Sequence, residues 1–170
     1  MLRDEGMSAI EMFNWRYGVN GMASDKKGTF GILQKTVEQK DPDGFEEALR
    51  ACFPMQHWDG VCELLAEALV ADWHFRHEDI ALAIQDLKCA CAVEALEQRA
   101  ASNPDYLEWD ENHALARKCT WALADIGSDA AKQALERLSN SDILVVRGFA
   151  QKRIDNWHLE ISRKGGCSFE

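Results

Sequence analysis

The stretch from Arg117 to Leu135 constrains the fold of this chain more than any other. Small and apolar residues recur every three or four positions between Cys119 and Ile126, which places them on one face of a helix. Gly127 then supplies a helix stop, and a second run of the same periodicity begins almost at once. The stretch therefore predicts two helices joined by a short turn.

The same pattern recurs on both sides of this hairpin. The apolar pattern of residues 80–87 has its counterpart 39 positions later, at 119–126. Residues 146–154 repeat it again, with Ile154 a step of 31 positions beyond Leu123. Self-similarity at such periods is typical of helical solenoids, in which each repeat packs on its neighbours. We predict an all-α fold, an α-solenoid of about four helix hairpins with an N-terminal helical cap.

A chain of 170 residues is expected to form a single domain. Residues 1–29 would be the cap and a loop, 30–157 the repeats, and 158–170 a C-terminal tail that frays. The predicted helix pairs are 30–39 with 45–53, 59–73 with 76–87, 92–101 with 117–126, and 129–138 with 143–157. Asp59 and Asp142 are the expected N-caps of two of these helices.

The cysteines are expected to be reduced. Of the six, Cys52, Cys62, Cys89 and Cys119 occupy positions where a helix would hold a small apolar residue, so core thiols are favoured over disulfides. One residue separates Cys89 from Cys91, and this is not the two-residue gap of zinc knuckles. We therefore predict no metal site there.

Negative charge is concentrated in the middle of the chain. The net charge is −10, and residues 59–111 hold 13 acidic and 3 basic residues. Such a field repels nucleic acid and attracts basic surfaces, so the favoured partner is a basic protein and no nucleic acid is expected. A merely solubilising surface is the alternative.

The chain begins without a basic and apolar leader and lacks a run of roughly 18 apolar residues, so we expect a cytoplasmic protein with no membrane contact.

Residues 102–113 form an insertion that has no counterpart in the neighbouring repeats. This insertion loop is a contact candidate because it combines two aromatic residues with four carboxylates. The candidate residues are Tyr106, Glu108, Trp109, Asp110 and Glu111, together with Asp105. In the alternative reading, Leu107 and Trp109 pack onto the helices while the acids face water.

The second helices of the pairs predict a further contact surface. In a solenoid of hairpins these helices usually line the concave side, and the residues outside their apolar faces would form a stripe. Exposed aromatics ringed by charge are typical of protein interfaces. The stripe contains Asp79, Leu82, Asp86, Lys118, Trp121, Asp125, Phe149, Lys152 and Asn156, of which we select Asp79, Asp86, Trp121, Asp125 and Phe149 as partner-binding. Packing of Trp121 against the insertion loop is the alternative.

With these residues in view, the chain resembles HEAT-repeat proteins of the short bacterial type, close to the phycobilisome-lyase-like repeats. The resemblance is carried by residues 122–127, by the alanines and leucine of 130–135, and by Val145–Arg147 after an Asp. It covers about 59–157 well and 30–53 weakly. HEAT solenoids mostly present binding surfaces, so the resemblance implies a fold more than an activity. Gln151 and Arg153 replace small apolar residues of the family and are expected to meet solvent.

Two classes of enzyme with HEAT repeats are alternatives to a binding role, and the residues of this chain favour neither. Deoxyhypusine hydroxylases bind two irons through several His-Glu pairs, and this chain has one such pair, His77-Glu78, so we predict no metal and no cofactor. His74 and His77 are instead expected in a half-buried polar cluster at a helix junction. DNA glycosylases of this fold need a basic groove, which the acidic middle argues against.

The sequence therefore predicts a non-catalytic protein-binding module. Small acidic HEAT-like proteins that resemble this one occur among the immunity proteins of bacterial toxin systems, including contact-dependent growth inhibition. That resemblance implies an inhibitor of a basic nuclease-type toxin domain. A phycobilisome-lyase-like role and a general assembly scaffold remain as alternatives.

Overall fold

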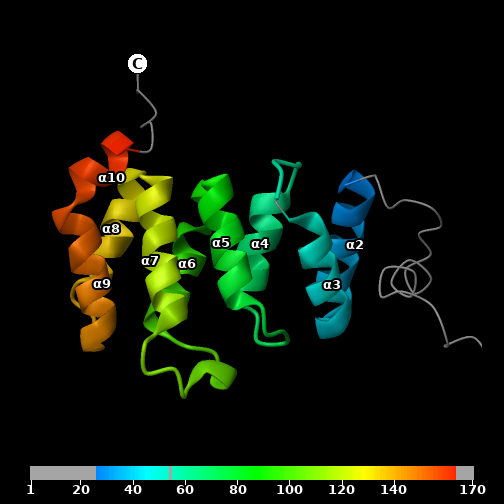
Figure 1. Cartoon of the computed structure of the whole chain (residues 1–170), viewed down its shortest axis with the longest axis horizontal. Coiled ribbons are helices and arrows are strands. Elements are labelled where there is room, and N and C mark those ends of the chain that lie inside the picture. The colour runs from blue at the N-terminus through cyan, green and yellow to red at the C-terminus, as the bar shows by residue number, and fades with distance from the viewer. Residues whose placement is uncertain (1–25, 54, 164–170) are drawn as a thin grey trace, which may run out of the picture. The chain divides into compact units, whose positions relative to one another are not determined.

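The computed structural model describes residues 26–53 and 55–163, which form helices and connecting loops, with no strand in either range (Figure 1). The α-helices are α2 (Lys26–Gln39), α3 (Pro42–Cys52), α4 (Val61–Val70), α5 (His77–Leu87), α6 (Val93–Ala101), α7 (Ala114–Ile126), α8 (Asp129–Leu138), α9 (Leu144–Asp155) and α10 (Trp157–Arg163). The predicted all-α class is confirmed for this part of the chain. The predicted cap lies largely outside the described residues.

The chain divides into two compact units, residues 1–56 and 57–170. In the described part of the first unit, α2 packs against α3. The turn between them is stabilised by Asp41, whose side chain accepts a hydrogen bond from the Gly44 N–H at 3.1 Å, and by Pro42 at the helix start. Phe45 and Leu33 lie in the core of this pair.

The second unit contains two rows of helices. Contacts run from α4 to α6 to α8 in one row and from α5 to α7 to α9 in the other (Figure 1). The residues that carry the sequence repeat lie between the rows, because Ile80, Ile84 and Leu123 are completely buried. The apolar periodicity therefore identified the core faces of α5 and α7 correctly.

The joint between α7 and α8 follows the prediction. Gly127 ends α7 with φ of 68°, a left-handed conformation that glycine adopts without steric cost. Ser128 begins α8 by accepting a hydrogen bond from the Ala131 N–H at 3.2 Å. The predicted caps Asp59 and Asp142 were wrong: α4 begins after Gly60 and α9 after Ile143, and neither has a side-chain cap.

Arg99, on α6, binds the C-terminal end of α4 in the preceding helix pair. It is 5% exposed, although arginine is rarely buried. Its Nε donates to the Leu69 carbonyl at 2.8 Å, and its Nη2 donates to the Val70 and Ala71 carbonyls at 2.8 and 3.3 Å. These carbonyls end α4 and have no intrahelical partner of their own. Arg99 therefore caps the C-terminus of α4 from α6, and its ion pair with Asp72 lowers the pKa of that carboxyl.

The expectation of four reduced thiols was wrong, because Cys62 and Cys89 form a disulfide. Cys62 lies in the first turn of α4 and Cys89 follows the end of α5, so the bond closes the open end of the α4–α5 hairpin. Apolar periodicity could not predict this pairing. It shows which face of a helix a cysteine occupies, but not which residue of a neighbouring helix lies opposite it. Cys52 and Cys119 are buried thiols as expected, and burial raises the pKa of each to about 12.

Reduction of the Cys62–Cys89 bond is expected to lower the free energy of unfolding of the second unit by about 3 kcal/mol, because the bond closes a loop with a sequence separation of 27. Urea unfolding with and without a thiol reductant measures this. The Cys62→Ser, Cys89→Ser double variant should match the reduced protein, whereas Cys91→Ser, which changes an exposed thiol, should match the oxidised one. Identical urea midpoints in both redox states would contradict the expectation.

The C-terminal residues differ from the predicted fraying tail. Residues 157–163 form α10, which contacts α7 and α9. Arg153, expected in solvent, is 5% exposed because its Nη1 donates to Glu160 Oε1 of α10 at 2.7 Å. Gln151 is exposed as expected. An ion pair between α9 and α10 therefore covers the end of the array.

Candidate functional site

Two connections meet at one end of the second unit. Residues 71–76 join α4 to α5, and the insertion loop, 102–113, joins α6 to α7; both lie at the lower edge in Figure 1. His77 and Tyr106 link them, because His77 Nδ1 lies 3.0 Å from the Tyr106 hydroxyl. The insertion loop is therefore held by the neighbouring repeat as well as by its own ends.

The hydrogen bonds of the two buried histidines determine their tautomers. His77 Nε2 lies 2.7 Å from the Ala71 carbonyl, which can only accept, so Nε2 carries the proton and Nδ1 accepts from the Tyr106 hydroxyl. His74 follows the same logic: Nε2 donates to the Ala68 carbonyl at 2.8 Å, and Nδ1 accepts from the Arg76 N–H at 3.1 Å. The predicted polar cluster does lie at a helix junction, but both imidazoles are completely buried and not half-buried as expected. Because burial lowers the pKa of each, both are neutral near pH 7.

Burial lowers the pKa of His77 to about 4, and it also lowers the pKa of His74. In the unfolded chain, histidine titrates near 6.5, so the unfolded state binds more protons than the folded state between roughly pH 6.5 and 4. The free energy of unfolding should therefore fall as the pH drops through this window. For His77 the loss is about 2 kcal/mol between roughly pH 7 and 5.

Urea unfolding at those two pH values tests the effect. His77→Asn should lose stability at pH 7 and show a weaker dependence on pH, because the titrating group is gone. His57→Asn changes an exposed histidine and should keep the dependence of the unchanged protein. An unchanged pH dependence in His77→Asn would show that another group is responsible.

Three aromatic side chains form a cluster on these two connections, which we call the aromatic cluster: Phe75, Tyr106 and Trp109. The rings of Phe75 and Tyr106 meet edge to face with centroids 5.3 Å apart, and the Trp109 indole N–H donates to the Tyr106 carbonyl at 2.8 Å. Phe75 is 64% exposed and Trp109 is 79% exposed. Leu107 packs inward as the alternative reading expected, but Trp109 does not.

The carboxylates of the insertion loop have two roles. Asp105, Glu108 and Glu111 are exposed and give negative charge to the loop that carries Tyr106 and Trp109. Asp110 faces its own backbone instead: it accepts from the Asn112 N–H at 3.0 Å and from the Ala114 N–H at 2.7 Å, at the start of α7. Asp110 was predicted as a contact residue, and the structure gives it a capping role that the sequence reading missed.

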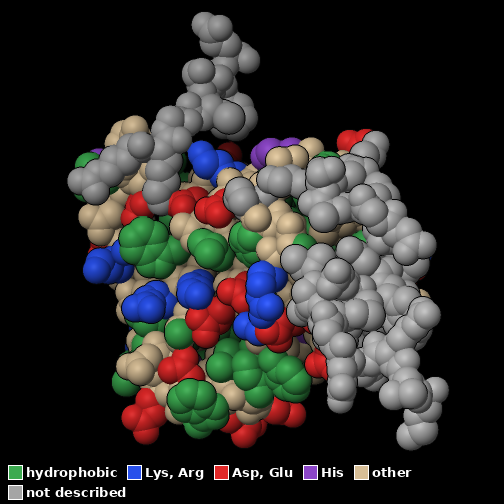
Figure 2. Space-filling model, turned by 45° about the vertical axis from the view of Figure 1, so that its right-hand side comes forward, with side chains coloured by type: hydrophobic (Ala, Val, Ile, Leu, Met, Phe, Trp, Pro, Cys, Tyr) green, Lys and Arg blue, Asp and Glu red, His purple; other side chains and the backbone are tan. Residues whose placement is uncertain are grey.

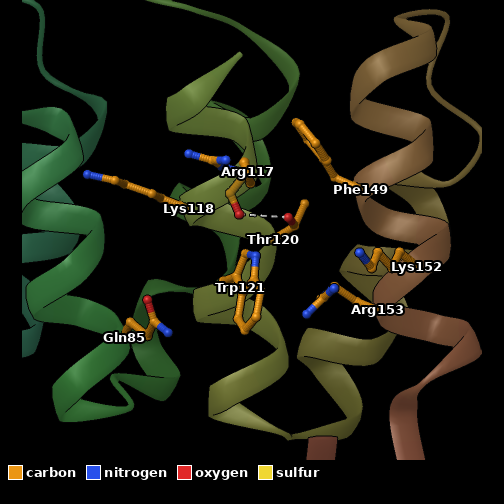
Figure 3. Close-up of a pocket in the computed structure, with 8 residues that line it drawn as sticks. All are labelled: Gln85, Arg117, Lys118, Thr120, Trp121, Phe149, Lys152 and Arg153. Atoms are coloured by element: carbon orange, nitrogen blue, oxygen red, sulfur yellow. Dashed lines mark hydrogen bonds between the residues drawn. The ribbon is translucent and has the colours of Figure 1, made fainter. Parts of the chain in front are cut away.

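The stripe predicted on α5, α7 and α9 has a different environment from the one expected. Trp121 is 41% exposed and, with Phe149, lines a groove between α7 and α9 of about 430 Å³ (Figure 3). The other residues that line it are Gln85, Arg117, Lys118, Thr120, Lys152 and Arg153. The expectation of aromatics flanked by acids was wrong, because the side chains around them are basic.

The three acids of that stripe are not among the residues that line the groove, although one of them bonds a lining residue. The Asp79 carboxylate lies 3.6 Å from the guanidinium of Arg76, which immediately precedes α5, and Asp86 is exposed on α5. Asp125 is half-buried and accepts a hydrogen bond from Gln85 Nε2 at 2.5 Å. Asp125 therefore tethers α7 to α5.

The surface carries both signs of charge. Figure 2 shows one face on which Lys and Arg side chains gather in a band between groups of hydrophobic side chains, with acidic side chains beside them. Net charge along the sequence therefore did not predict the charge of each face. The signal that could have identified the groove is a pair of basic doublets, Arg117-Lys118 and Lys152-Arg153, each within one turn of an aromatic residue.

No group of three or more His, Cys, Asp or Glu side chains with metal-site geometry occurs within residues 26–53 and 55–163. None of the helices described there is long and apolar enough to cross a membrane.

Comparisons with protein-family models, with curated proteins and with solved structures find no match to this chain. The resemblance to HEAT-repeat proteins accordingly stays a prediction from the residues.

Proposed function

We propose that this chain is a non-catalytic protein-binding module, a HEAT-like α-solenoid that binds a basic protein through its insertion loop. The two rows of contacting helices support the solenoid part of the proposal. The observation that carries the functional part is the aromatic cluster: Phe75 of the α4–α5 connection and Trp109 of the insertion loop are both largely exposed, and the insertion loop also carries the exposed acids Asp105, Glu108 and Glu111.

The geometry of the insertion loop suits tight binding for three physical reasons. The hydrogen bond from Tyr106 to His77 and the burial of Leu107 hold the loop before a partner arrives, so little conformational entropy is lost on binding. Exposed aromatic side chains are the usual anchors of protein interfaces. The surrounding carboxylates accelerate encounter with a cationic surface and reject acidic proteins.

The most concrete partner is a basic nuclease-type toxin domain, which makes the chain an immunity protein acting in the cytoplasm. That identity is supported by the resemblance to small acidic HEAT-like immunity proteins and by the acidic middle of the chain. Inhibition needs only that a rigid acidic loop covers the cationic surface with which such a toxin binds nucleic acid. No catalytic group of this chain takes part.

Calorimetric titration tests the proposal. The probe is a purified basic nuclease domain of a bacterial toxin, titrated at about 50 mM and about 500 mM salt together with an assay of nuclease activity. We expect binding with inhibition at low salt and weaker binding at high salt. Absence of both binding and inhibition at either salt concentration would overturn the immunity assignment, and adjacent phycobilisome genes would favour the lyase-like alternative.

A further inference from the structure

The groove between α7 and α9 carries an inference that is independent of the insertion loop. Its lining combines two aromatic side chains, Trp121 from α7 and Phe149 from α9, with four basic side chains. A second hollow of about 250 Å³ shares Trp121, Lys152 and Arg153 with it and continues to Leu159 of α10. The two hollows therefore adjoin one another at these shared residues.

Helical spacing explains why this groove is basic in an acidic chain. Arg117 and Lys118 precede Trp121 by one turn of α7, while Lys152 and Arg153 follow Phe149 by one turn of α9. Each helix thus presents an aromatic side chain and a basic doublet on the same face. Figure 3 shows Arg117 and Phe149 near one end of the groove, and Trp121 beside Arg153 nearer the other.

The four cations differ in how far the protein neutralises them. Lys118 lies 2.8 Å from Glu78, and Arg153 pairs with Glu160 while its guanidinium lies 4.1 Å from the centroid of the Trp121 ring. Arg117 and Lys152 have no carboxylate within ion-pair distance in the described part of the chain. The groove therefore offers two cations to a ligand, beside two aromatic rings.

We propose that this groove binds a short acidic peptide segment of a partner protein. Carboxylates of the segment would pair with Arg117 and Lys152, and an apolar side chain between them would pack on Trp121 and Phe149. An extended segment suits two adjoining hollows better than a compact ligand does. Nucleic acid is disfavoured, because two available cations cannot neutralise a run of phosphates against a net charge of −10.

Nuclear magnetic resonance of the tryptophan indole N–H groups tests this inference in the full chain. The probe is a capped tetrapeptide of alternating aspartate and leucine, and the matched peptide has asparagine for aspartate; Trp121→Phe assigns the resonance. We expect the Trp121 signal to shift with a Kd of roughly 0.1–1 mM. The Trp109 signal, on the insertion loop, should not move.

Two double variants that change the net charge equally distinguish the effect of the groove residues from the effect of net charge. Arg117→Gln with Lys152→Gln should weaken peptide binding by about tenfold or more. Lys35→Gln with Lys132→Gln removes two positive charges outside the groove and should leave the affinity unchanged. The inference is overturned if the asparagine peptide shifts Trp121 equally, if the groove variant binds as before, if no shift occurs, or if a hexathymidine oligonucleotide binds more tightly than the peptide.

Because the peptide test uses no basic partner, its result does not depend on whether the proposed function is correct. A toxin domain could bind the insertion loop while the peptide fails to bind the groove, and the reverse result is equally distinguishable. The Trp109 and Trp121 indole signals report the two surfaces individually.

Discussion

Replacement of Arg99 by methionine should lower the free energy of unfolding by about 2–4 kcal/mol, the largest stability effect that we expect from replacing one polar side chain of this protein. Methionine keeps the aliphatic volume but removes the guanidinium. The carbonyls of Leu69 and Val70 then lose the donor that caps α4, whereas the Ala71 carbonyl keeps its hydrogen bond from His77. Urea unfolding followed by circular dichroism measures the change.

Arg137→Met is the matched control. Arg137 also makes a two-point ion pair, with Glu97 at 2.6 and 2.7 Å, but its side chain is 58% exposed. Exposed ion pairs contribute little to stability, so this variant should unfold at nearly the same urea concentration as the unchanged protein. Equal urea midpoints for the Arg99 and Arg137 variants would contradict a capping role for Arg99.

Replacement of Trp109 by alanine should weaken binding of the basic partner by about 2 kcal/mol, or roughly thirtyfold in Kd, with little loss of stability. The side chain is 79% exposed and therefore contributes mainly to contacts with other molecules. The effect should appear in the dissociation rate, because an aromatic anchor acts after encounter. Leu144→Ala, at an exposed apolar residue of α9, should leave the affinity unchanged.

The acids of the insertion loop should act on the association rate. Neutralising Asp105, Glu108 and Glu111 together should slow association about tenfold at low salt and much less at high salt. Neutralising Asp59, Glu63 and Glu67, which are exposed at and along α4, changes the net charge equally and should have a smaller effect. Equal effects of the two triple variants would show that net charge alone governs association.

The helices could be predicted from the sequence because their signals are local. Spacings of three and four residues identified the buried faces of α5 and α7, and Gly127 marked the end of α7 as the structure has it. Helix starts were less predictable: α4 and α9 begin without a side-chain cap. Asp110 caps α7 across four residues, a bond that depends on the path of the insertion loop.

The contacts that define the two surfaces could not be predicted, because they join residues far apart in the chain. Lys118 meets Glu78 from the preceding repeat, and Arg153 stacks on Trp121 from another helix. Sequence charge gives the sign of a segment, but helix packing decides which charges meet. The basic environment of Trp121 and Phe149 was missed for this reason, whereas the exposure of Trp109 agrees with its position in a polar insertion.

Hydrogen–deuterium exchange of the complex tests the central claim most directly. The chain is compared alone and bound to the basic nuclease domain. If the insertion loop and the adjoining α4–α5 connection form the binding site, amides of residues 102–113 and 71–76 should exchange more slowly in the complex, while those of α8 should not change. Unaltered exchange of residues 102–113 in a saturated complex would contradict the account.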